Sequence, residues 1–412
     1  DLYLNSTALP GHVTANSILN VMGNDVTVYD TGVSSTTSKI PQQFLSDASI
    51  LEQMPLFVSG KWIDRIYVPI CATLGIVGNV LAFCVLVSAR GTGSTTYVYM
   101  AALSLSDSMV QVVNILWFVR KFPGHETIKD GTCQFVFFLM HFGMHSSVVV
   151  MVTMTIERYL AICYPLRAAT WFTVRRAVVI VAMETLIIMG LNLQHLIIRE
   201  MYVDEGSGNE YCRTIPGFTT FYAQKIWPWI DGVLYCYGPL LCLCVFNVLI
   251  VRQVRASRSF QSKTTLSDTT LSADQRSSHT KTSSKMTTQE SQLTRMLLLV
   301  TTAFLVCVGP MGVVIVVERY FWETTTNSQY ALYYFIRTIL NNLDYTNHAL
   351  NFYLYCLSGK RFRQELVNTF SRLCPASMTA AASGKAVRMA TQSRDSYASG
   401  SVATVATEAS MS

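Results

Sequence analysis

A charged pair near the end of a long apolar stretch is the first place where residue types suggest chemistry. The stretch runs from Cys133 to Pro165, and Glu157, Arg158 and Tyr159 stand where it meets a basic loop. An apolar run of this length is read as membrane-spanning, and ions close to hydrocarbon are costly and usually functional. Either Arg158 extends to lipid headgroups with Glu157 as its neutralising partner, or the pair has a functional role.

The composition indicates an integral membrane protein. Half of the 412 residues are hydrophobic and 14% are charged, whereas soluble domains carry about a quarter charged residues. The net charge of +6 does not indicate a nucleic-acid partner, because Lys and Arg cluster between apolar runs. The sequence contains no catalytic triad, phosphate-binding loop or metal-ligand spacing, so we do not expect an enzyme.

Seven apolar runs are each long enough to cross a hydrocarbon core of about 30 Å as a helix. They span residues 66–89, 97–119, 134–157, 176–197, 229–251, 295–317 and 331–357, and Glu184 and Asn192 interrupt the fourth. The fold class that we predict is therefore an all-α membrane protein, a seven-transmembrane helix bundle. Most loop arginines fall on one side if the runs alternate, which predicts a cytoplasmic location for that side and an extracellular amino terminus.

The segments outside the runs are polar. Residues 1–64 predict a disordered extracellular arm with a glycosylation sequon at Asn5, and 65–374 the membrane domain. Within it, 253–293 is rich in Ser and Thr and predicts a flexible cytoplasmic loop, while 375–412 predicts a disordered tail. No basic and apolar leader follows Asp1, so either the start is missing or the first helix targets the chain.

Two cysteines are expected to form a disulfide outside the cell. Residues 197–215 predict a β-hairpin with its turn at 206–209, and the second strand carries Cys212. Cys133 lies at the outer end of the third run, so both thiols face an oxidising compartment. No other pair has both ends plausibly outside, and we predict the bridge Cys133–Cys212.

The ordered set of motifs resembles the rhodopsin-like (class A) G-protein-coupled receptors over about residues 66–374. The matching positions are Gly78-Asn79, Leu103 to Asp107, Cys133, Glu157-Arg158-Tyr159, Pro165, Pro239, Phe304, Cys307, Pro310, Asn351 to Tyr355 and the amphipathic segment after it. The form of helix seven resembles invertebrate FMRFamide-type and related neuropeptide receptors, in which Phe follows Asn as Phe352 does here. The resemblance implies a plasma-membrane protein with a heterotrimeric G protein, arrestin and membrane lipids as partners.

The resemblance also places partners around Asp107, a carboxylate near mid-membrane. Ser147, Asn347 and Asn351 stand where the family has them, and this oxygen-rich cluster holds either a sodium ion or an internal hydrogen-bond network. Sodium is the one cofactor that we consider. His348 is unusual at its position and is either a satisfied core histidine or a source of pH sensitivity.

A second implied element is a cytoplasmic latch. Glu290 lies at the start of helix six, where an acid in similar receptors pairs with the arginine that corresponds to Arg158; Tyr355 belongs to the same switch. Opening the latch would admit a G protein, and the alternative for Glu290 is a solvated surface residue. Three departures affect this mechanism: Phe352 replaces a usual Pro, Val308 a usual Trp and Asn247 a usual Tyr.

The ligand is predicted to be a peptide. Met140, which we also predict to contact the ligand, stands where amine receptors have Asp, and helix seven contains no Lys for a retinal Schiff base. Asp231 and Asp344, in the outer halves of helices five and seven, suit a peptide bearing Arg, as an Arg-Phe-amide does. Alternatively they are hydrogen-bonded core acids or partners of Arg337. Side chains that line the same cavity, or simply pack in the bundle, are Trp117, His141, His145, Trp229, Tyr334 and Arg337.

We therefore predict a G-protein-coupled receptor for an extracellular neuropeptide, amidated and basic, that signals by outward movement of helix six. The alternatives are a receptor for a small aromatic or lipid ligand, or a seven-helix transporter, which would require a row of membrane-embedded ionisable residues. Cys374, after the short amphipathic helix 362–373, is either a palmitoylation site or a plain exposed thiol.

Overall fold

The computed structural model describes residues 48–89, 93–120, 132–203, 210–217, 221–267, 276–320 and 326–373. Side chains within 257–293 and 318–320 lie outside this description. The chain divides into two units, Asp1–Gly359 and Lys360–Ser412.

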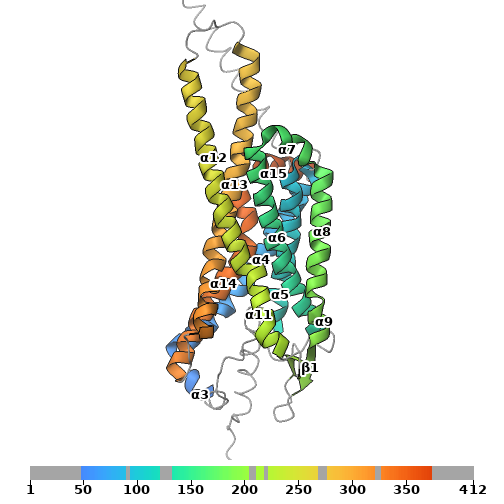
Figure 1. Cartoon of the computed structure of the whole chain (residues 1–412). Helices are drawn as coiled ribbons and strands as arrows, with labels where there is room; N and C mark the ends of the chain where they lie inside the picture. Colours follow the sequence, from blue (N-terminus) through green and yellow to red (C-terminus); the bar gives the residue numbers. More distant parts are fainter. Residues whose placement is uncertain are drawn as a thin grey trace, which may run out of the picture. The chain divides into compact units, whose positions relative to one another are not determined.

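The first unit is a bundle of membrane helices (Figure 1). Its long helices are α4 (Pro55–Ser88), α5 (Thr95–Arg120), α6 (Thr132–Cys163), α8 (Val174–Asn192), α12 (Gly238–Ser267), α13 (Arg276–Tyr320) and α14 (Asn327–Ser358). Shorter elements are α3 (Ala48–Leu51), α7 (Pro165–Trp171) and α9 (Gln194–Ile198). The first and last of the long helices, α4 and α14, pack against each other, α5 packs between α4 and α6, and α13 packs on α14.

Six of the described helices are apolar and long enough to cross a membrane, and α14 is not among them. The reason is a buried polar face on α14, where several amide, carboxylate and imidazole groups point into the bundle. Its members are Asn341, Asn342, Asp344, Asn347, His348 and Asn351. Hydropathy averages over all faces of a helix and therefore underestimates one whose polar side is covered by its neighbours.

The fourth membrane helix, α8, is continuous through its two polar interruptions. Glu184 accepts a hydrogen bond from the Thr153 hydroxyl of α6. Asn192 is buried and lies 3.1 Å from His145, also on α6. Both polar side chains face the bundle, so they position α8 and do not end it.

The first membrane helix begins earlier than predicted. It starts at Pro55, and the short helix α3 precedes it, so ordered structure begins at Ala48, inside the segment 1–64 that the sequence assigned to a disordered arm. Proline is favoured at the first helical position. The added turns are held by a cluster in which Phe57 packs on Tyr330 and Tyr334, with 4.6 Å between the Phe57 and Tyr334 ring centroids.

The predicted flexible loop 253–293 is also corrected. Helix α12 continues to Ser267 and α13 begins at Arg276, so only residues 268–275 fall outside the described helices. The segment is polar but contains no Gly or Pro. Without these breakers a polar segment can continue a helix that has already formed.

The fifth membrane helix is irregular over its first turns. The π-helical segments η2 (Tyr222–Ile226) and η3 (Gly232–Tyr237) flank α11 (Trp227–Asp231), and α12 follows. Pro239 lacks an N–H and so removes one helical hydrogen bond, which favours such a distortion close to it. The π turns place Asp231, Tyr235 and Cys236 in the interior of the bundle.

A close approach between α5 and α6 depends on Gly143. A Cβ there would lie 2.9 Å from a Val110 methyl carbon and 3.2 Å from the Ser106 carbonyl oxygen. Any larger residue would push apart the two helices that carry Asp107 and Ser147.

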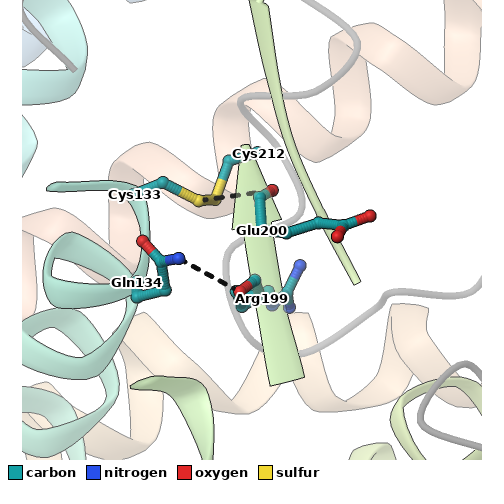
Figure 2. The surroundings of a disulfide bond; sticks show 5 residues. All are labelled: Cys133, Gln134, Arg199, Glu200 and Cys212. Atoms are coloured by element: carbon teal, nitrogen blue, oxygen red, sulfur yellow. Dashed lines mark hydrogen bonds between the residues drawn. A yellow bond between two sulfur atoms is a disulfide. The ribbon is translucent and has the colours of Figure 1, made fainter. Parts of the chain in front are cut away.

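A two-stranded hairpin lies beside the start of α6. Strand β1 (Arg199–Val203) pairs antiparallel with β2 (Glu210–Thr214), with Met201 opposite Cys212. The predicted disulfide Cys133–Cys212 is present and ties β2 to α6 (Figure 2). Gln134 also donates to the Arg199 carbonyl oxygen at 3.2 Å, so both strands are fixed to α6. The second unit contains helix α15 (Lys360–Leu373).

Loss of the disulfide should destabilise the protein measurably. It closes a sequence separation of 79 residues, and a crosslink of that span restricts the unfolded chain by about 4 kcal/mol. We expect the double variant Cys133→Ala/Cys212→Ala to melt several degrees below wild type in detergent. Cys244→Ala, at an exposed free cysteine, is the control and should melt like wild type. Equal melting of the double variant and this control would contradict a stabilising role.

Candidate functional site

A small cavity lies between α6, η3, α13 and α14. It offers about 20 Å³ to the centres of water-sized molecules, which is room for roughly one water. Its lining residues are Met140, Met144, Tyr235, Cys236, Val308, Met311, Ile315, Arg337, Asn341, Asp344 and Tyr345. The wall is mainly apolar, and its charged members come from α14.

The carboxylate of Asp344 is the acceptor in this wall. The Tyr235 hydroxyl donates to its Oδ1 at 2.6 Å, and the same hydroxyl lies 3.2 Å from Nε2 of His348. Arg337, seven residues before Asp344 on α14, also lines the cavity. One of its guanidinium nitrogens lies 3.3 Å from the Met311 sulfur. The cavity therefore presents one anion and one cation to any molecule that enters it.

Asp231 is used differently. Its Oδ1 lies 3.0 Å from Nε2 of His145, and Nδ1 of His145 lies 3.2 Å from the Asn192 oxygen. These contacts join α6, α8 and α11. Asp231 is not among the residues that line the cavity, and its contact with His145 places it at the interface between helices.

Three of the predicted pocket residues line the cavity, and the others do not. Met140, Arg337 and Asp344 are in its wall. His141 stacks on His195 with 4.0 Å between ring centroids, and Trp117 packs edge-on against Phe137. Trp229 is 44% exposed on the outer surface, and Tyr334 belongs to the Phe57 cluster.

Sequence reasoning missed several lining residues that helical spacing would have found. Met144 is one turn after Met140, and Asn341 is one turn after Arg337, so each pair shares a helix face. Tyr235 could not be found in this way, because the π turns before Pro239 shift the register of the fifth helix.

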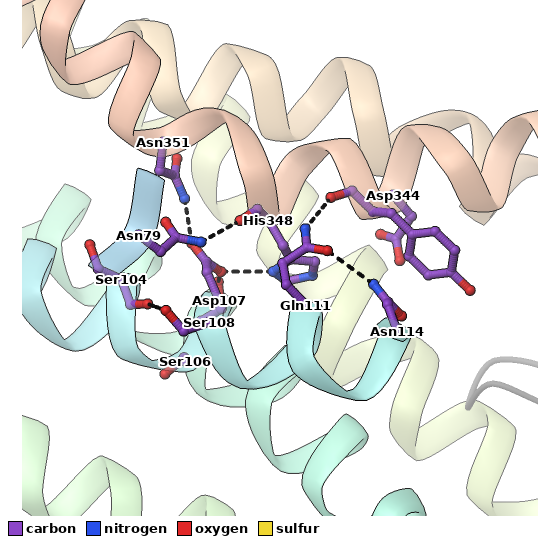
Figure 3. A network of polar contacts seen from close by, with 12 residues as sticks. Asn79, Ser104, Ser106, Asp107, Ser108, Gln111, Asn114, Asp344, His348 and Asn351 are labelled. Carbon is purple, nitrogen blue, oxygen red and sulfur yellow. Dashed lines mark hydrogen bonds and ion pairs between the residues drawn. The ribbon is translucent and has the colours of Figure 1, made fainter. Parts of the chain in front are cut away.

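Asp107 is the centre of a buried polar network (Figure 3). Its Oδ1 accepts from the Ser147 hydroxyl at 2.7 Å and lies 2.7 Å from Nδ1 of His348. Its Oδ2 accepts from Nδ2 of Asn351 at 2.6 Å. These bonds connect α5 with α6 and α14, and Asn79 of α4 adds a 2.8 Å bond to the His348 carbonyl oxygen.

These residues do not fit a sodium ion well. Sodium requires a shell of oxygen ligands, whereas two of the three groups that contact Asp107 present nitrogen to it. Asn347, predicted as a ligand, has a buried Nδ2 without a hydrogen-bond partner. The side-chain arrangement is that of an internal hydrogen-bond network.

The Glu157–Arg158 pair contacts α5. Glu157 is buried and accepts from the Thr95 hydroxyl, and from the Tyr99 hydroxyl at 2.9 Å. Arg158 lies 3.3 Å from Glu157 and donates to Thr95 at 3.1 Å. The glutamate is therefore a hydrogen-bonded interior group, and the arginine is held beside it at the junction of α5 and α6.

Comparison with known proteins decides the family. The sequence profile of the 7 transmembrane receptor (rhodopsin family) matches residues 78–355. The chain belongs to this receptor family. A probable G-protein-coupled receptor of Caenorhabditis elegans is 26% identical over 325 residues, which cover 73% of this chain and 67% of the relative. The somatostatin receptor type 5 of Rattus norvegicus is 26% identical over 317 residues, covering 75% and 78%.

Family membership makes the chain a multi-pass membrane receptor with an extracellular ligand and a G-protein partner, not an enzyme. Several predicted positions of the receptor lie outside the described residues: Asn5, Cys374 and the side chain of Glu290. Tyr355 is fully buried in α14. Tyr159 packs on Phe246 of α12, with 5.4 Å between ring centroids.

A hydrogen bond joins α12 to α13 in the receptor. Nδ2 of Asn247, the residue that replaces a usual Tyr, donates to the Thr301 hydroxyl oxygen at 2.8 Å. Farther along, Arg295 of α13 donates to the Ser358 carbonyl oxygen of α14 at 3.3 Å. Both contacts would have to break or change if α13 moved away from its neighbours.

Removal of the Asn247 bond should raise basal signalling. A net hydrogen bond contributes about 1 kcal/mol, so Asn247→Ala should increase ligand-independent nucleotide exchange on a G protein up to about fivefold. Thr302→Ala is the matched control, because the Thr302 hydroxyl donates to the Leu298 carbonyl oxygen within its own helix. An unchanged rate in Asn247→Ala, or an equal rise in the control, would show that this bond does not hold α13.

Proposed function

We propose that this receptor binds an extracellular neuropeptide that carries a basic residue next to an aromatic one, such as an amidated peptide ending in Arg-Phe. Binding would activate heterotrimeric G proteins through outward movement of α13. The observation that carries the proposal is the carboxylate of Asp344 in the wall of a mainly apolar cavity.

A guanidinium group suits this carboxylate. Asp344 is 8% exposed, and its Oδ1 is held by the neutral Tyr235 hydroxyl, not by a cation. A charged donor that enters the cavity can share or replace that bond and forms a stronger, charge-assisted one. Arg337 in the same wall would repel a second cation, which favours a ligand with one basic group near Asp344.

The remaining wall suits an aromatic side chain. Met140, Met144 and Met311 are flexible and polarisable, and thioethers make favourable contacts with rings. Val308 stands where the family commonly has Trp, so the floor of the cavity lacks that large ring. Because the present space holds about one water, a ligand ring would have to displace these methionines.

The peptide class is supported by two further observations. The rat relative is a somatostatin receptor, and the chain has a disulfide-anchored hairpin. We propose that this hairpin is extracellular and covers the entrance to the cavity, as the excess of basic residues in the opposite loops favours. It follows that the amino terminus, with Asn5, is extracellular, and that α15 and Cys374 are cytoplasmic.

The partners inside the cell follow from the same orientation. Arg158, Glu290 and Tyr355 belong to the proposed switch that a G protein opens, and phosphorylated Ser and Thr of the tail would recruit arrestin. A panel of amidated peptides ending in Arg-Phe, applied to cells that express the receptor at the plasma membrane, tests the proposal by calcium and cyclic AMP. Responses to a small aromatic compound or a lipid, with none to peptides, would contradict it.

Substitution of the two acids that were predicted to bind the ligand should have different effects on agonist potency. Asp344→Asn should weaken an active Arg-Phe-amide by about 10- to 100-fold, because it removes a charge-assisted bond. Asp231→Asn should weaken it much less, since Asp231 contacts His145 and does not line the cavity. Concentration–response curves measure both effects.

A peptide without the basic charge distinguishes a lost charge interaction at Asp344 from a folding defect of the variant receptor. Replacing the peptide's Arg by citrulline keeps the shape and removes the charge, so Asp344→Asn should then cause little further loss. Two results would show that Asp344 does not contact the ligand's basic group. One is a potency loss from citrulline that multiplies with the loss from Asp344→Asn, and the other is an equal potency loss in Asp344→Asn and Asp231→Asn.

A further inference from the structure

The carboxylate of Asp107 is already surrounded by hydrogen-bond donors. Each carboxylate oxygen has at least one donor at hydrogen-bond distance: Ser147 and His348 at Oδ1, and Asn351 at Oδ2. Asp107, Ser147 and His348 are 0% exposed and Asn351 is 2% exposed. These donors take three of the roughly four lone-pair positions of the carboxylate, and both positions on Oδ1 are occupied.

His348 is the group least suited to share Asp107 with sodium. A carboxylate can only accept, so the 2.7 Å contact requires a hydrogen on Nδ1 that points at Oδ1. This N–H occupies the direction from which a cation would bind. It also offers no lone pair to an ion, because that nitrogen already carries its proton.

The imidazole is held in this position from two other directions. Its Nε2 lies 3.2 Å from the Tyr235 hydroxyl oxygen. Because the hydroxyl hydrogen is donated to Asp344, this contact is a hydrogen bond in the imidazolium form, in which Nε2 also carries a hydrogen and donates it. The His348 carbonyl oxygen accepts from Asn79 at 2.8 Å, which fixes this turn of α14 against α4. Rotation of the ring away from Asp107 would also separate Nε2 from the Tyr235 hydroxyl, so both ring nitrogens hold the imidazole in this orientation.

We infer that the His348 N–H takes the place of a sodium ion at Asp107, and that it joins Asp107 to the ligand cavity through Tyr235 and Asp344. The stability of this receptor is then indifferent to sodium. The inference concerns the bundle interior and does not depend on which ligand the receptor binds.

The test measures sodium-dependent stability of the purified full-length receptor in detergent. Its melting temperature is compared in sodium chloride and in choline chloride at equal concentration. A ligand that binds only the folded state raises the melting temperature. We expect no difference for wild type, and a rise of a few degrees in sodium for His348→Ser, which removes the N–H and adds a hydroxyl oxygen.

Two controls make the result decisive. His195→Ser changes another fully buried histidine, far from Asp107 in the chain and in contact with His141 and Trp227, and should remain indifferent to sodium. Asp107→Asn, combined with His348→Ser, should abolish the gained response. Wild-type stabilisation by sodium that Asp107→Asn removes would overturn the inference.

The remaining outcomes also decide it. If His348→Ser folds and gains no sodium response, His348 is not the excluding group and the assignment is wrong. If that variant does not fold, His348→Asn and the wild-type comparison carry the test, because wild type alone must lack a sodium response. Ligand-free nucleotide exchange in the two salts gives a second readout and should show the same pattern.

Discussion

A buried carboxylate must be surrounded by donors, and in this receptor that requirement falls on Asp107. In the interior of a membrane bundle an unpaired charge is costly enough to exclude structures that leave it unpaired. The donors come from α6 and α14, and Asn79 of α4 braces the same turn of α14. Helices that are distant in the sequence are thereby fixed at one depth, and two members of the buried polar face of α14, His348 and Asn351, supply donors to this network.

The same network extends to the cavity that we propose as the ligand site. His348 contacts both Asp107 and the Tyr235 hydroxyl, and Tyr235 donates to Asp344 in the cavity wall. A ligand that takes Asp344 from Tyr235 would alter a bond two steps from Asp107. At the other end of α6, Glu157 accepts from Thr95 and Tyr99. The receptor thus has polar contacts at three levels of an otherwise apolar bundle, and a change at one level can bias the arrangement of helices at the others.

The sequence predicted the helices well because hydrocarbon imposes length and apolarity on each of them. It predicted the disulfide because topology left one pair of cysteines on the same outer side. Element ends were less well predicted: Pro55 begins a helix inside the presumed arm, and 253–293 lacks the Gly or Pro that would stop α12 and α13. Polar Ser and Thr residues resemble a loop in composition, yet they do not break a helix.

The contacts between side chains within the bundle were harder to predict than the positions of the helices along the sequence. Asp231 and Asp344 looked equivalent in the sequence, but Asp231 contacts His145 whereas Asp344 lies in the cavity wall. Likewise, the sequence predicted Asn347 as a sodium ligand beside Asp107. In the structure the next residue along α14, His348, makes the contact with Asp107 instead. Such choices depend on helix rotation, which a pattern of residue types does not specify.

In this receptor Asp107 and His348 act as one unit that holds α5 to α14. A double-mutant cycle on the free energy of unfolding, with Asp107→Asn, His348→Asn and the combined variant, tests it most directly. We expect a coupling energy of about 1 kcal/mol or more, so that the combined variant loses clearly less stability than the sum of the single losses. Additive losses would contradict the claim.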